Sequence, residues 1–102
     1  MSEADLLEAV NPDDPRVVVI LPASLTRLFP GAAHRVDIRA ATVADVMRGL
    51  DERWPGMRDR LCDTTPAIRR HINVFVNGER ATLNTPLRPG VEVFIVTAIS
   101  GG

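Results

Sequence analysis

Two adjacent glycines, Gly101 and Gly102, stand at the end of the sequence and place its last carboxylate on a residue without a side chain. Glycine makes up about 7% of residues on average, so such a pair occupies the last two positions by chance in about one chain in 200. Because glycine has no Cβ atom, its backbone enters channels too narrow for other residues. The pair therefore marks the Gly102 carboxylate as the first candidate for chemistry in this chain, with a flexible tail of small residues as the alternative.

Other side chains with chemical potential are few and stand apart. The single cysteine, Cys62, has no partner for an internal disulfide, which is typical of a reducing compartment, and its place after Leu61 favours a packing role. His34 and His71 are expected on strands, and no cysteine or carboxylate is spaced to bind a metal with them. All twelve basic residues are arginine, so no lysine can form a Schiff base. We expect neither a metal site nor an enzyme active site.

The composition fits one soluble domain of 102 residues, and no apolar run approaches the roughly 20 residues that cross a bilayer. The first 15 residues carry five acids and no base and do not resemble a signal peptide, so we expect a cytoplasmic protein. Nucleic acid is not an expected partner, because the arginines form no basic stripe and aromatic residues amount to 4%. An arginine-bearing remainder behind an acidic start is weak evidence for acidic protein partners.

The chain divides into three parts. Residues 1–15 contain Pro12 and Pro15, each of which disfavours helix for the residue before it, and we expect an acidic, flexible leader. Residues 16–99 are expected to form the folded domain. Residues 100–102 are expected to be a flexible C-terminal Gly-Gly tail.

The folded domain is expected to open with two strands. The β-branched segment 16–21 is apolar on both faces, which predicts a buried central strand. Segment 34–39 alternates polar and apolar residues, as a strand with one wet face does. Residues 23–33 between them are expected to form a loop or a short turn region.

The clearest element is a helix that begins after Thr42, whose hydroxyl is expected to accept a hydrogen bond from the backbone N–H of Asp45. Its apolar residues follow at helical spacing and form one stripe that faces the core: Val43, Val46, Met47, Leu50 and Trp54. Pro55 and Gly56 end the helix. Residues 57–67 are less regular, with a short helix predicted around 58–61.

A second hairpin and a final strand complete the domain. Asn77 and Gly78 join segments 71–76 and 79–83, and an Asn-Gly pair between β-rich segments is the strongest short hairpin signal. Residues 85–90 are expected to form a turn, and residues 91–99 are predicted to form the last strand. We therefore predict an α+β, β-grasp (ubiquitin-like) fold, in which a mixed sheet wraps around one main helix and the first and last strands are central and parallel.

With this predicted order of elements, the sequence resembles the ThiS/MoaD-type sulfur carriers, and more closely the MoaD-like carriers of actinobacterial cysteine biosynthesis. The resemblance rests on the segment His71-Ile72-Asn73-Val74-Phe75-Val76-Asn77-Gly78-Glu79, on Gly90-Val91-Glu92-Val93, and on the terminal Gly101-Gly102. The order of elements from Arg16 to Gly102 agrees as well.

This resemblance implies a carrier rather than an enzyme. A ThiF/MoeB-like adenylyltransferase would consume ATP to adenylate the carboxylate of Gly102, and a sulfur donor would then convert it to a thiocarboxylate. Ser100 and Gly101 would thread into the partner's active site. A sulfur-accepting synthase would receive the sulfur, and the chain would bind no cofactor itself and be a monomer when alone.

Strand parity predicts a docking surface for such partners. If Ile72 and Val93 point into the core, the neighbouring strands place Phe75, Phe94 and Val96 together on the outer face of the sheet, near the tail. An exposed apolar patch of this kind marks a partner site, unless the leader or the Ser24–Ala33 loop covers it. Nearby arginines could add a charged rim: Arg39, Arg69, Arg70 and Arg88.

Two other functions remain open at this point. The chain could be the small subunit of molybdopterin synthase, which stays in the same family. It could also be a ubiquitin-like binding or conjugating module that never carries sulfur.

Overall fold

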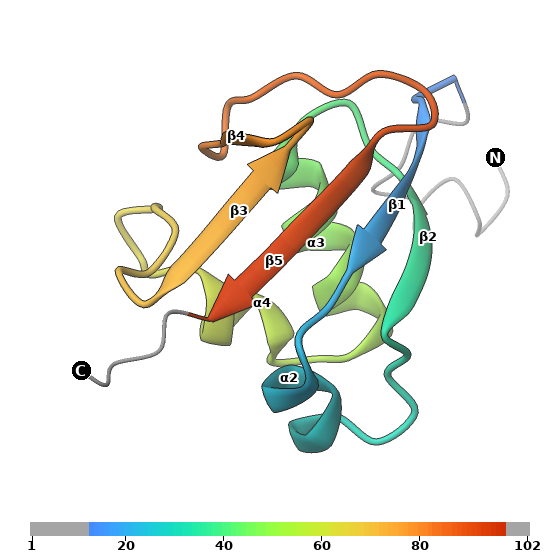
Figure 1. The fold of residues 1–102 in the computed structure, drawn as a ribbon. Helices are drawn as coiled ribbons and strands as arrows, with labels where there is room; N and C mark the ends of the chain where they lie inside the picture. Colours follow the sequence, from blue (N-terminus) through green and yellow to red (C-terminus); the bar gives the residue numbers. More distant parts are fainter. Residues whose placement is uncertain (1–12, 98–102) are drawn as a thin grey trace, which may run out of the picture.

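The computed structural model describes residues 13–97. Figure 1 shows a twisted sheet with the main helix packed behind it. The elements are, in chain order, β1 (Arg16–Ile20), α2 (Ala23–Leu28), β2 (Arg35–Arg39), α3 (Val43–Arg53), α4 (Met57–Leu61), β3 (Ile72–Val76), β4 (Glu79–Arg80) and β5 (Glu92–Thr97). No helix among these is long and apolar enough to span a membrane.

The five strands form one mixed sheet in the order β2-β1-β5-β3-β4. Its two central strands, β1 and β5, are parallel neighbours, while the three other pairings are antiparallel. The first and last strands of the domain are therefore central, as the sequence predicts. The α+β, β-grasp fold with one main helix is confirmed.

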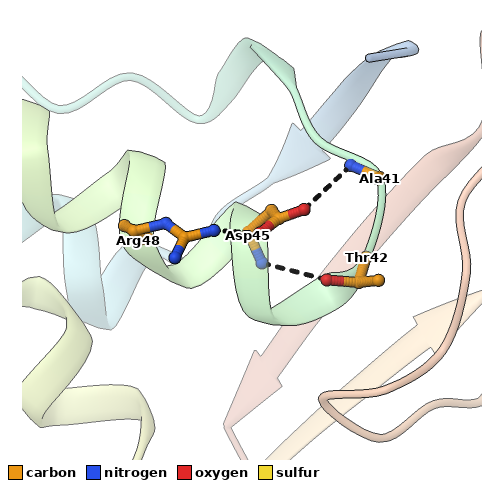
Figure 2. A network of polar contacts seen from close by, with 4 residues as sticks. All are labelled: Ala41, Thr42, Asp45 and Arg48. Carbon is orange, nitrogen blue, oxygen red and sulfur yellow. Dashed lines mark hydrogen bonds and ion pairs between the residues drawn. The ribbon is translucent and has the colours of Figure 1, made fainter. Parts of the chain in front are cut away.

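The main helix, α3, begins where the sequence predicts. The Thr42 hydroxyl accepts a hydrogen bond from Asp45 N at 3.3 Å, and the Asp45 carboxylate in return accepts one from Ala41 N at 3.2 Å, as Figure 2 shows. Two backbone donors that the helix cannot satisfy internally are thus satisfied by side chains. The same carboxylate pairs with Arg48 one turn further along the helix. These contacts fix the start of α3 over the sheet.

The predicted stripe of α3 faces the core. Four of its five members are buried: Val43, Val46, Met47 and Leu50. Trp54 is the residue that ends the helix, and it packs half-buried against the core. Gly49 lets α3 approach β2 closely, because a Cβ atom at this position would lie 3.2 Å from Cγ2 of Ile38. All buried side chains among residues 13–97 are apolar.

Residues 23–33 are not simply a loop or turn region, because α2 occupies Ala23–Leu28. Pro22 precedes the helix, and its carbonyl accepts hydrogen bonds from the N–H groups of Leu25 and Thr26. Leu25 points inward and is only 4% exposed. A single anchoring leucine gives too little periodicity for the helix to be predicted from the sequence.

The second hairpin has the predicted turn but shorter strands. Asn77 and Gly78 both have positive φ, of 54° and 81°, which is the conformation a two-residue hairpin turn requires. The return strand β4 spans only two residues, since the chain leaves the sheet after Ala81 to reach α3, where Ala44 N donates to Leu83 O. Residues 98 and 99 of the predicted last strand lie outside the described residues.

Candidate docking face and carrier terminus

The outer face of the sheet, opposite α3, carries the side chains predicted for docking. On β5, Val93 and Ile95 are buried, whereas Phe94 and Val96 are each 41% exposed. The neighbouring strand β3 alternates in the same way and places Phe75 half-buried on the outer face. Strand parity therefore assigned these faces correctly.

The strand register aligns outer side chains into a row across the whole sheet. Phe94 lies opposite Phe75 on one side and Ile20 on the other. The row ends with Arg35 beyond Ile20 and with Arg80 beyond Phe75. Directly opposed residues share a face of the sheet and lie within contact distance of each other. We call these five residues the outer row: an apolar centre with a guanidinium group at each end.

Three members of the outer row were missed from the sequence. Ile20 stands in a segment that is apolar on both faces, so its orientation becomes clear only from the parallel pairing with Phe94. Arg35 and Arg80 take the rim position that the sequence assigned to other arginines. The alternation of faces along the strands of the two predicted hairpins could have identified both arginines as outward-facing.

The arginines predicted for the rim lie at separate places. Arg39 donates to Asp14 O at 3.1 Å, on the edge strand β2. Arg69 donates through Nε to Asp59 O at 2.8 Å, just before β3. Arg70 adjoins Arg69, and Arg88 is exposed in the connection between β4 and β5.

Charge on the outer face is partly balanced. Arg35 Nη1 lies 3.5 Å from Glu92 Oε2, and both side chains are exposed, so this ion pair contributes little to stability. Beside it, a hollow of about 400 Å³ is lined by Val18, Arg35, Glu92 and Phe94 among others. The apolar centre of the face is therefore accessible and bordered by charged groups.

The end of β5 is the last described part of the chain before the terminal glycines. Val96 is opposite Asn73, and Thr97 is opposite Ile72 at the start of β3. Ser100, Gly101 and Gly102 lie outside the described residues, so their roles stay predictions. The described part of β5 ends at Thr97, beside the start of β3, as Figure 1 shows.

The structure places Cys62 in the core and the two histidines next to strands. Cys62 is buried, and desolvation by burial raises the pKa of its thiol, although the nearby Arg58 acts in the opposite direction. His34 and His71 lie immediately before β2 and β3 rather than on them, and His34 Nδ1 lies 2.8 Å from Leu21 O. Residues 13–97 contain no group of three or more histidine, cysteine or acidic side chains placed to hold a metal.

The sequence model of the ThiS family matches residues 19–102. The matched region contains the whole sheet from Val19 onward and also the Gly101-Gly102 pair. Small archaeal modifier protein 1 of Haloferax volcanii is 32% identical over 81 residues, a stretch covering 78% of this chain and 93% of that protein.

Solved structures agree in fold. The chain is similar to one in the crystal structure of the BexX/CysO complex of Amycolatopsis orientalis, with a TM-score of 0.75 and 29% identity over 84% of this chain and 99% of the other. It is also similar to CysO of Mycobacterium tuberculosis, with a TM-score of 0.72 and 27% identity over 81% of this chain and 99% of the other. Small archaeal modifier protein 1 of Haloferax volcanii gives a TM-score of 0.72 at 28% identity, over 85% and 99% of the two chains.

Proposed function

This chain belongs to the ThiS family of non-catalytic, ubiquitin-like carriers, and we propose that it carries sulfur as a thiocarboxylate on Gly102. The observation that carries the proposal is the extent of the family match, which continues past the end of β5 through Gly101 and Gly102. Among residues 13–97, Cys62 is a poor competing nucleophile, since it is buried and its pKa is raised.

The proposed chemistry begins at a poor electrophile. The negative charge of a carboxylate repels nucleophiles, so an adenylating enzyme must first join the Gly102 carboxylate to AMP, with release of pyrophosphate from ATP. A sulfide-equivalent nucleophile then attacks the acyl carbon; a carbon–sulfur bond forms and AMP leaves with the oxygen. The resulting thiocarboxylate is anionic and a strong nucleophile, suited to transfer its sulfur to an acceptor. ATP and catalysis belong to the partners.

We propose that the partners dock on the outer face. Phe75, Phe94 and Val96 offer apolar surface that the described part of the chain leaves accessible, and exposed apolar patches mark binding sites. Because Phe94 and Val96 belong to the strand whose described end, Thr97, lies only a few residues before Gly102, a partner bound there would have the terminal carboxylate within reach. For the acceptor we infer a synthase that builds cysteine or another sulfur-containing metabolite, by similarity to the CysO structures.

A second function is favoured by a specific observation. The 32% identity to small archaeal modifier protein 1 is consistent with attachment of this chain to other proteins through the same activated glycine. In that case the Gly102 carboxylate would form an amide bond with an amino group of a target. The small-subunit role in molybdopterin synthase shares the thiocarboxylate and differs in the identity of a stable large partner.

Intact-mass spectrometry of the protein from its native cell tests the proposal. A sulfur carrier shows a population heavier by the difference between sulfur and oxygen, located on Gly102 by fragmentation. Conjugates to other proteins without this population would support the modifier function instead. The same spectrum establishes whether the mature chain ends at Gly102, which the proposal requires.

Gly102→Ala tests the narrow-channel argument. We expect it to keep the melting temperature of the wild type and to lose thiocarboxylate, because the added Cβ obstructs the partner's channel. Ser100→Ala is the matched control, since it changes the same segment without adding bulk and is expected to load normally. Normal loading of Gly102→Ala would refute the argument.

A further inference from the structure

A second surface lies at the edge of the sheet formed by β3 and β4, and it meets the outer face at Arg80. It is a groove of about 670 Å³, within the range of small ligand-binding pockets. The loop before β3, the first half of β3, the segment after β4 and the first turn of α3 line it. Its apolar part includes Ile68, Ile72 and Leu83, of which Ile68 and Leu83 are half-buried.

The groove follows a part of β3 that has no strand beside it. Toward β5, all five residues of β3 are paired, whereas toward β4 the pairing covers only Phe75 and Val76. One further bond, from Ala81 N to Val74 O, precedes the point where the chain turns away. Within the described residues, the edge of β3 at Ile72 and Asn73 therefore borders the groove, although the N–H of Ile72 already donates to Arg69 O at 2.9 Å. An extended segment can lie along such an edge.

The charge of the groove is of one sign. Arg69, Arg70 and Arg80 line it, and no aspartate or glutamate does. Neither of the two ion pairs formed among residues 13–97 involves these arginines. The one hydrogen bond made by a guanidinium group here runs from Arg69 to the backbone carbonyl of Asp59. Asp63, which does not line the groove, offsets part of the charge of Arg69, since hydrogen bonds to its carboxylate and, to a lesser extent, this arginine lower the pKa of the Asp63 carboxyl. The charge on the groove itself is therefore positive. Such a surface attracts carboxylates.

We propose that this groove binds an extended acidic segment of a partner protein. Aliphatic side chains of the segment would pack on Ile68 and Leu83, and its carboxylates would meet the three arginines. Because Thr97 is opposite Ile72, the bound segment would lie near the described end of β5. The proposal does not depend on sulfur transport, since it concerns binding to the folded domain.

Selection from a library of random linear peptides tests the proposal without a known partner. The full chain is the bait, and peptides that also bind the variant Arg69→Gln/Arg70→Gln/Arg80→Gln are removed. We expect enriched peptides to combine aspartate or glutamate with aliphatic residues. Enrichment without acidic residues, or no enrichment at all, would overturn the proposal.

Amide chemical shifts in ¹H–¹⁵N spectra then locate the selected peptide. We expect shifts at residues 68–74 and 81–84, with affinity falling about tenfold in the triple variant and on raising the salt concentration. The matched control removes three exposed arginines elsewhere, Arg27→Gln/Arg60→Gln/Arg88→Gln, and should bind as the wild type does. Equal losses in both variants, or shifts confined to Phe94 and Val96, would refute the groove as the binding site.

A second copy of the chain is the competing occupant of this groove. It would show itself as concentration-dependent shifts of the same amides without peptide, together with a dimer in sedimentation. That result would replace the acidic partner with self-association. A monomer whose groove amides do not change on dilution supports the proposal.

Discussion

The two faces of β5 are both apolar, yet only one of them belongs to the core. Val93 and Ile95 are at most 2% exposed beneath α3, while Phe94 and Val96 are 41% exposed on the opposite face. Apolar composition alone therefore does not distinguish a packing residue from a binding residue. What distinguishes the two faces is the covering layer: the described chain places a helix over one face and leaves the other uncovered, where we propose that partners bind.

A matched pair of truncations would break or sustain this comparison. Val93→Ala should lower the free energy of unfolding by about 2 kcal/mol, because it leaves a cavity between β5 and α3. Val96→Ala removes the same two methyl groups from the outer face and should cost less than about 0.5 kcal/mol. Urea denaturation followed by circular dichroism measures both.

In a binding assay the order of the two effects should reverse, with Val96→Ala having the larger effect. Val96→Ala, and more strongly Phe94→Asp, should weaken docking of the adenylating partner, while Val93→Ala leaves it unchanged below its melting transition. Equal stability losses for the two alanine variants would show that both faces are structural.

The α3 helix covers the inner face of the sheet, and its position depends on the residue at which it begins. A substitution at that residue, Thr42, tests this with a smaller expected loss of stability. Thr42→Ala removes the hydroxyl that accepts from Asp45 N and should lower the free energy of unfolding by about 1 kcal/mol. Thr42→Ser keeps the acceptor and serves as the control. If the serine variant lost as much as the alanine variant, the effect would come from the methyl group rather than from the cap.

Most of the fold could be predicted from the sequence because its signals are local. The helical spacing of the α3 stripe, the Thr42 cap and the Asn77-Gly78 turn each require only a few neighbouring residues. The central, parallel placement of β1 and β5 followed from their hydrophobicity on both faces. The role of Gly102 in carrying sulfur is still a prediction, since it lies outside the described residues.

The remaining features depend on contacts between segments that are distant in the chain. The α2 helix is held by one buried leucine, so its pattern is too short to read. The outer row needs the register of four strand pairings before Arg35 and Arg80 join its ends. The groove at β3 arises because β4 stops after two residues, which strand propensity does not reveal.

The smallest expected effect concerns the thiol on the inner side, Cys62. Burial raises its pKa, so the folded state keeps the proton at a pH where the unfolded thiol has ionised. The unfolded state then binds fewer protons, and stability falls slightly as the pH rises from about 9.0, the ordinary pKa of the thiol, to the folded value. Cys62→Ala is less stable at every pH but should lack this extra decline, which urea titrations at pH 8 to 10 measure.

Iodoacetamide should label the native thiol at pH 7.5 at least about a hundredfold more slowly than the unfolded one. Equal labelling rates would mean that solvent reaches Cys62 in the folded protein. The inner side would then be closed to water beneath the sheet but not at the end of α4, where Cys62 lies.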